Sequence, residues 1–402
     1  MSNDPRPDDD IPTLRPLPPA DSEDDLRIEY ADYGEPPARP PAPPPDPGFG
    51  FWMAVVWCLL YVVAMQIVAG LLFGIPIIFI AIAIKQVQGQ PVPTDMAGIA
   101  NDPVMGPAFL TILVFSHVAG LFFGWIILRW RCGRKRWQRR IALSRLPTRT
   151  HAVLVLIGLP AMLTLSAAVE QPIMRFVPSI EDISRALFGV RIDLPGIEAL
   201  MPLLQKAPWP LALFAVAVLP AFNEEFWCRG FLGQGLSARY RNLGVVLIVS
   251  FLFGCLHLDP RQGLGAMLLG LAIHGSYLAT RSLWTAIAVH GINNGVAVVH
   301  TNDALFPVLK PVENALEQAP LLTIASAALL FAGVCFALYQ TRCRLVPETP
   351  GMPVWEPPDS AGVELPPPGS RTAVTHDPLS PVSVSFVLVG AIALGAVLAA
   401  YG

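Results

Sequence analysis

Long apolar windows dominate the chain from residue 51 to residue 401 and recur at short intervals. A helix needs about 20 apolar residues to cross a hydrocarbon core of about 30 Å, so each window predicts a membrane-spanning helix. The first window exceeds one simple span, so it is either a tilted helix bent near Gly74-Ile75-Pro76 or a span plus a re-entrant piece. We therefore expect an all-α polytopic membrane protein with eight to nine transmembrane helices. The windows lie near 51–84, 107–128, 152–169, 209–234, 243–258, 264–280, 283–300, 321–341 and 382–401.

The composition supports a membrane protein. Of 402 residues, 53% are hydrophobic and only 14% are charged, against about 25% charged residues in soluble chains. The six cysteines are scattered, with neither metal-site spacing nor the pattern of a disulfide framework. We expect the lipid bilayer as a partner and no nucleic acid.

The placement of Lys and Arg predicts the orientation. The loop from Arg129 to Arg140 carries seven positive charges and should face the cytoplasm, where it also contacts anionic lipid. The N-terminus is then cytoplasmic, and the loop near 170–208 is external with short helices of its own. We expect an integral protein of a bacterial cytoplasmic (inner) membrane. Further basic residues predicted on the same side are Arg239, Arg241, Arg281, Arg342 and Arg344.

Two segments differ from this apolar background. Residues 1–48 hold 14 prolines and 12 acidic residues, too polar to offset the entropy of ordering, and predict a disordered cytoplasmic tail. Residues 346–380 are rich in proline and predict a linker. The remaining regions are an N-terminal transmembrane part (49–207), a core (208–300) and C-terminal spans (301–402).

Three charged residues follow an apolar run where lipid is expected. Glu224, Glu225 and Arg229 come directly after Leu211–Phe222, although one charge at mid-bilayer costs about 2.5–3.5 kcal/mol. Glu225 and Arg229 are four residues apart and share a helix face, whereas Glu224 is rotated by about 100°. One carboxylate can therefore pair with the arginine while the other faces a different partner. A buried ion pair that only fixes helix packing is the alternative.

Two histidine motifs lie on neighbouring windows. His257 follows Phe253 by four residues, and Asn294 follows His290 by four. A histidine and an amide on one helix face can donate two hydrogen bonds to an oxyanion, and a glutamate beside a histidine suits acid/base hydrolysis. Interhelical hydrogen bonding is the plainer interpretation, and we expect it for His117.

Together these residues resemble the type II CAAX prenyl endopeptidase family, the CPBP or Rce1-like intramembrane proteases. The family motifs EExxxR, FxxxH and HxxxN are matched in order, at Glu224–Arg229, Phe253–His257 and His290–Asn294. The resemblance covers about 208–300 and implies a CPBP-type catalytic helix core.

The resemblance also implies roles for single residues. Glu224 would activate water, aided by His257. His290 and Asn294 would stabilise the oxyanion, and Glu225 with Arg229 would orient Glu224. This chemistry requires no cofactor, although ligands spread over three helices would also permit a divalent metal.

The expected function is an intramembrane endopeptidase acting on a membrane protein or peptide, lipidated or not. Two alternatives remain. Intramembrane acids and glycine-interrupted helices also occur in transporters, and the family includes non-catalytic scaffold or bacteriocin-immunity-type proteins.

Overall fold

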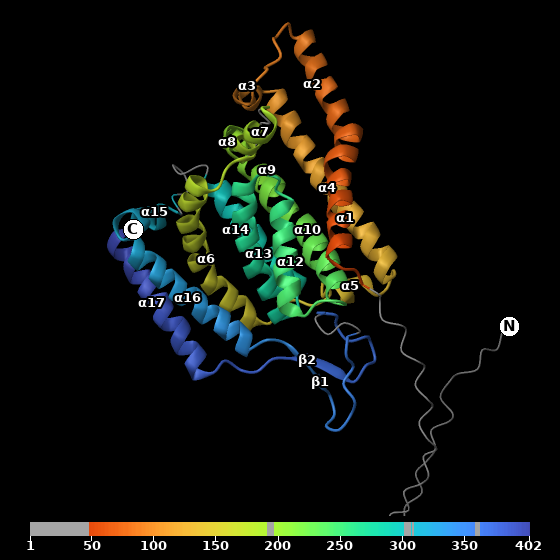
Figure 1. Ribbon diagram of the computed structural model, residues 1–402, viewed down its shortest axis with the longest axis vertical. Coiled ribbons are helices and arrows are strands. Elements are labelled where there is room, and N and C mark those ends of the chain that lie inside the picture. The colour runs from red at the N-terminus through yellow and green to blue at the C-terminus, as the bar shows by residue number, and fades with distance from the viewer. Residues whose placement is uncertain (1–47, 191–196, 301–306, 308, 358–361) are drawn as a thin grey trace, which may run out of the picture. The chain divides into compact units, whose positions relative to one another are not determined.

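A computed structural model of the chain describes residues 48–190, 197–300, 307, 309–357 and 362–402. Its contacts divide the chain after Pro44, and the fold described below is the unit that begins at Pro45 (Figure 1). The predicted tail, residues 1–48, lies outside the described residues except for Gly48.

The described chain is almost entirely helical, and this confirms the predicted all-α membrane fold. Every predicted window holds a helix, and seven helical runs in the described residues are long and apolar enough to span a membrane. Those runs are Phe51–Val87, Met105–Cys132, Arg149–Phe188, Trp209–Leu236, Pro260–Thr280, Pro320–Gln340 and Pro381–Tyr401.

The first run is one continuous helix with no re-entrant piece. It comprises α1 (Phe51–Val62), two π-helical segments (Val63–Val68 and Gly70–Gly74) and α2 (Ile75–Val87). Its 37 residues correspond to about 56 Å at 1.5 Å per residue, well beyond a hydrocarbon core of about 30 Å. The run must therefore tilt or extend past the core.

The two remaining windows form helices of a different kind. Helix α12 (Asn242–Cys255) has only 14 residues, and α14 (Leu283–His300) carries three polar side chains in its middle. Helix α14 lies inside the bundle, where it packs on α13 (Pro260–Thr280) and α10 (Leu219–Glu225), whereas α12 packs on α13 and exposes Leu243, Leu247 and Phe251 on its other face. Because protein rather than lipid surrounds much of their surface, they tolerate a shorter length and polar residues.

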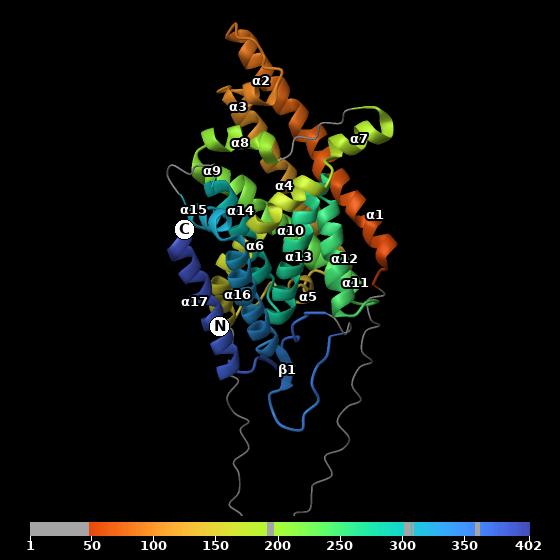
Figure 2. The same ribbon diagram turned by 60° about the vertical axis from the view of Figure 1, so that its left-hand side comes forward.

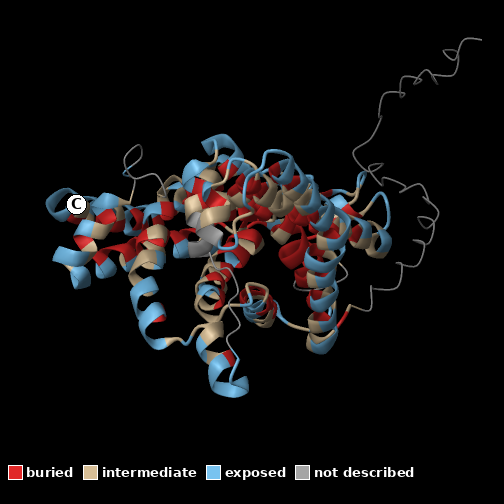
Figure 3. Ribbon diagram, turned by 90° about the horizontal axis from the view of Figure 1, so that it is seen from above, coloured by how far each residue is buried: buried red, intermediate tan, exposed pale blue. Residues whose placement is uncertain are grey.

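Other helices flank this central group. Helix α4 (Met105–Cys132) packs on α10, while α6 (Arg149–Phe176) packs on α13, α14 and α16 (Pro320–Gln340). Helix α17 (Pro381–Tyr401) covers α16 on the outside, as Figure 2 shows. Buried residues gather where these helices face one another, and the outward faces are exposed (Figure 3).

Short helices complete the described fold. The 170–208 region holds α7 (Ile180–Phe188) and α8 (Ile197–Lys206), as expected. The other short helices are α3 (Met96–Asn101), α5 (Trp137–Arg140), α9 (Trp209–Leu213), α11 (Gly233–Leu236) and α15 (Lys310–Gln318).

The Pro-rich segment is more than the linker that the composition predicts. Strand β1 (Arg344–Pro347) pairs antiparallel with β2 (Thr372–Thr375). Between them Glu364 is buried, and both of its carboxylate oxygens accept hydrogen bonds of 2.6 Å from Arg136, while Arg140 donates one of 3.1 Å. Burial alone would raise the pKa of Glu364, but these guanidinium groups outweigh it and lower the pKa. The basic loop thus supplies the counter-charge of the buried Glu364 carboxylate, and this fixes the Pro-rich segment against the loop.

Candidate functional site

The two glutamates lie on a helical run whose hydrogen-bonding register changes on both sides of them. Helix α10 ends at Glu225, between π-helical segments at Phe214–Val218 and Phe226–Leu232. Pro220 lies inside this continuous helical run, where proline has no N–H to donate to the carbonyl four residues earlier. Such π segments recur at functional sites, and here one begins directly after Glu225 while the other ends at Val218.

The predicted pair of Glu225 and Arg229 is present and fully buried. Arg229 Nη1 donates to Glu225 Oε1 over 2.8 Å, and neither side chain is exposed. Arg229 Nη2 donates to the Gly270 carbonyl on α13 over 3.0 Å, and the guanidinium lies 4.7 Å from the centre of the Phe253 ring. A Cβ at position 270 would approach this guanidinium to 3.3 Å, so a glycine there allows the close contact between the helices.

His290 connects this pair to Glu224. Its Nδ1 lies 2.8 Å from Glu225 Oε1, and because a carboxylate only accepts, Nδ1 carries the proton. Its Nε2 lies 3.9 Å from Glu224 Oε2, which is too far for a direct hydrogen bond and suits a water between them. The Glu224 side chain is 17% exposed. The two adjacent carboxylates therefore occupy different environments.

The structure does not join His257 and Asn294 to the carboxylates by hydrogen bonds among the described residues. His257 Nδ1 donates to the Phe253 carbonyl over 2.9 Å, and Asn294 Nδ2 donates to the Val216 carbonyl over 3.2 Å. The Phe253 ring stands between the histidines, with its centre 5.0 Å from that of His257 and 5.6 Å from that of His290. Phe253 thus spaces the two imidazoles and also contacts Arg229.

Helices α4 and α1 add polar residues that the sequence motifs do not include. Asn223 Nδ2 lies 3.2 Å from a ring nitrogen of His117, so His117 bonds a neighbouring helix as expected. A Cβ at Gly120 would lie 2.8 Å from Asn223 Oδ1, which explains why glycine stands there. Tyr61 is buried and stacks on Trp227 with ring centres 4.7 Å apart. Asn223 could have been identified from the sequence because it directly precedes Glu224.

Unpartnered polar atoms mark this region. The buried oxygens without a hydrogen-bond partner among the described residues include Tyr61 Oη, Asn223 Oδ1, Glu224 Oε2 and Glu225 Oε2. Buried polar atoms normally find a partner, either protein or water. Several such atoms around two carboxylates are typical of a site that takes up water or substrate.

Among the described residues, no three His, Cys, Asp or Glu side chains are grouped closely enough to hold an ion. The imidazole and carboxylate groups near Glu224 instead contact one another or backbone carbonyls, and no step below involves a metal.

Comparison with known proteins gives one match. No curated protein and no solved structure matches the chain. A family model described as Type II CAAX prenyl endopeptidase Rce1-like matches residues 206–296. This range nearly coincides with the predicted core, 208–300, and contains all six predicted site residues. The chain therefore carries an Rce1-like domain, of the type II CAAX prenyl endopeptidase kind, at residues 206–296.

Proposed function

We propose that the protein is an intramembrane endopeptidase in which Glu224 activates the hydrolytic water. The observation that carries this proposal is that the two adjacent glutamates have different surroundings. Glu225 is fully buried and accepts hydrogen bonds from Arg229 and His290. Glu224 is partly exposed and has one unpartnered oxygen facing His290 Nε2. A carboxylate that is reachable and not held by a cation can accept a proton from water.

The proposed reaction follows from this geometry. Glu224 takes a proton from water as the water oxygen bonds to the carbonyl carbon of the substrate. The C–N bond then breaks, and Glu224 passes the proton to the leaving nitrogen. The hydrolytic water would bond to both Glu224 Oε2 and His290 Nε2, which lie 3.9 Å apart. The proposed reaction needs no cofactor.

Oxyanion stabilisation would come from His290 and Asn294. His290 would donate from Nε2 as an imidazolium that takes its second proton from solvent before the reaction begins, and Glu225 would balance that charge through Nδ1. Asn294 uses one amide hydrogen on the Val216 carbonyl, and its second hydrogen remains for a substrate oxygen. We assign His257, fixed by the Phe253 carbonyl, a supporting role at the edge of the site.

The substrate we propose is a membrane protein or peptide, lipidated or not, cut close to the bilayer. This rests on the Rce1-like domain and on the position of Glu224 within a membrane-spanning run. We further propose a bacterial cytoplasmic membrane with the N-terminus on the cytoplasmic side, from the positive charges between Arg129 and Arg140.

The test compares membranes of cells that carry the parent protein with membranes of cells that carry Glu224→Gln. We expect a precursor to accumulate in the variant, measured by quantitative proteomics with N-terminal peptide labelling. Glu181→Gln is the matched control, because Glu181 lies on α7, outside the Rce1-like domain, and forms a partly exposed pair with Arg185. Unchanged cleavage in Glu224→Gln, at equal protein level, would sink the proposal. Retained cellular function without cleavage would favour a scaffold, and ion flux that depends on Glu224 would favour a transporter.

A further inference from the structure

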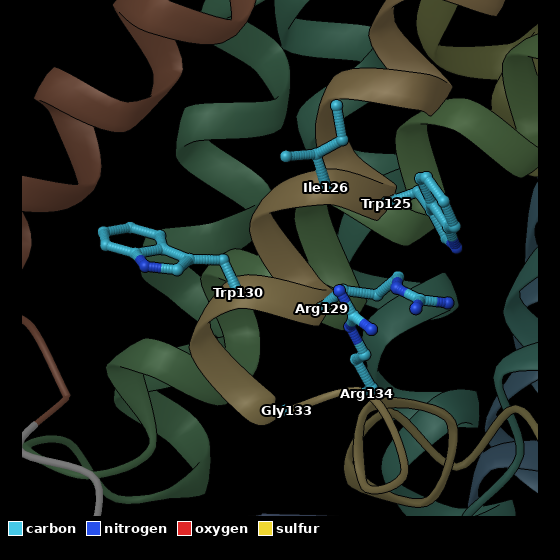
Figure 4. Close-up of a pocket in the computed structure, with 6 residues that line it drawn as sticks. All are labelled: Trp125, Ile126, Arg129, Trp130, Gly133 and Arg134. Atoms are coloured by element: carbon cyan, nitrogen blue, oxygen red, sulfur yellow. The ribbon is translucent and has the colours of Figure 1, made fainter.

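A hollow at the end of α4 lies outside the Rce1-like domain and takes no part in the proposed hydrolysis. It has a volume of about 520 Å³, and Figure 4 shows that its lining comes from the last turns of α4 and the residues that follow. The lining residues are Trp125, Ile126, Arg129, Trp130, Gly133 and Arg134.

Two arginines give the hollow its charge. Arg129 and Arg134 both line it, and in Figure 4 the Arg134 side chain extends upward toward Arg129. The Arg129 guanidinium is held 4.8 Å from the centre of the Trp125 ring. Within the described ranges, neither arginine forms an ion pair with a carboxylate.

The other half of the same basic loop has a carboxylate counter-ion. Glu364 accepts hydrogen bonds from Arg136 and Arg140 and lies 4.0 Å from Arg139. The protein thus supplies an internal counter-ion for the second half of the loop, whereas no carboxylate in the part of the chain that the structure describes pairs with Arg129 or Arg134. Two like charges on one cavity favour a bound anion.

The apolar side chains around the hollow indicate which class of anion would bind there. Phe122 is 58% exposed, Ile126 44% and Trp130 68%, and these side chains continue the outer surface of α4 up to the hollow. Tryptophan is enriched at membrane interfaces, and guanidinium groups bind phosphate oxygens in pairs. An acyl chain fits along Phe122 and Ile126 while the phosphate meets the arginines.

We propose that this hollow binds the phosphate headgroup of an anionic phospholipid. Arg129 and Arg134 contact the phosphate, Trp125 orients Arg129, and Trp130 stands at the boundary of the hydrocarbon. A soluble phosphate would use the arginines but not Phe122 or Ile126.

The experiment measures lipid retention by the purified full-length chain. Native mass spectrometry in mild detergent compares added phosphatidylglycerol, phosphatidylcholine and inorganic phosphate. We expect phosphatidylglycerol to be preferred and Arg129→Gln/Arg134→Gln to weaken its binding about tenfold or more, since each basic residue near a lipid surface contributes about a factor of five. Arg239→Gln/Arg241→Gln is the matched control, with the same charge change on exposed residues predicted on the same side.

Three results would overturn the proposal. Equal loss in both double variants would show a general charge effect, and binding of inorganic phosphate without a lipid preference would show a soluble-anion site. Unchanged lipid binding by the Arg129/Arg134 variant would show that the hollow does not bind lipid. If the acid-rich residues 1–47 are then easier to digest with protease in that variant, that segment occupies the hollow instead. A thermal unfolding curve of each variant checks folding. Brominated phosphatidylglycerol adds an independent readout, because it should quench less tryptophan fluorescence in Trp130→Phe than in the parent.

Discussion

Glu224 and Glu225 are neighbours in the chain, yet their replacement by glutamine should have opposite consequences. Glu225 lies with Arg229 in a pair that has no exposed surface, and it also accepts from His290. Glu225→Gln leaves the Arg229 charge buried with neutral partners alone: the glutamine oxygen, the Gly270 carbonyl and the Phe253 ring.

The size of the effect follows from this burial. Removing one partner of a buried ion pair costs about 3–5 kcal/mol, because the remaining charge stays desolvated. We therefore expect Glu225→Gln, or Arg229→Met, to lower the free energy of unfolding by about 3 kcal/mol or more. The double variant leaves no uncompensated charge, so its loss should be smaller than the sum of the two single losses by about 2 kcal/mol.

Glu224→Gln is the internal control for this prediction. Its side chain is 17% exposed, and among the described residues no cation lies closer to it than the His290 ring nitrogen at 3.9 Å. Its replacement should change stability by less than about 1 kcal/mol while stopping cleavage.

The assay is reversible unfolding of the purified protein in mixed micelles, titrated with a denaturing detergent. Tryptophan fluorescence reports the transition, since Trp227 on the same run is buried and stacked on Tyr61. Equal destabilisation by Glu224→Gln and Glu225→Gln would refute the claim that only Glu225 belongs to a stabilising buried ion pair. Strict additivity of the Glu225 and Arg229 single variants would refute the ion pair as the cause.

Two further predictions concern the parts of the fold around the site. Glu364→Gln should lower stability by about 2 kcal/mol at neutral pH, because it leaves Arg136 and Arg140 without their buried counter-charge. The folded pKa of Glu364 is below its ordinary value of 4.5, so this stabilisation is present above pH 4.5 and is lost as the pH falls through the folded pKa. Unfolding curves of parent and variant should converge on acidification, and a constant gap would contradict the assignment. His117→Leu removes the partner of Asn223 between α4 and α10 and should cost about 1 kcal/mol. Asn223→Leu/His117→Leu should cost little more than either change alone, and full additivity in the same assay would show that the two side chains act separately.

The helical framework could be predicted because it depends on local patterns. Apolar windows of about 20 residues satisfy the backbone inside a bilayer only as helices, so the spans appear wherever the windows do. The pair of Glu225 and Arg229 was also predictable, since a spacing of four places two side chains on one helix face whatever surrounds them.

The partners of the remaining site residues depend on packing between helices. Periodicity places His290 and Asn294 on one face, but it does not show that His290 meets Glu225 or that Asn294 meets the Val216 carbonyl. Nor does it show Phe253 between the two imidazoles. A π segment also shifts the face on which a residue lies, and the sequence does not show where one forms.

Contacts between residues that are distant in the sequence could not be predicted either. Glu364 meets Arg136 across 228 positions, and Asn223 meets His117 across 106. The sequence alone determined the membrane helices, the ion pair within one helix and the family motifs, because each depends on residues within a few turns. The tertiary structure decided which carboxylate is held and which is left to react, because that depends on side chains brought together from different helices.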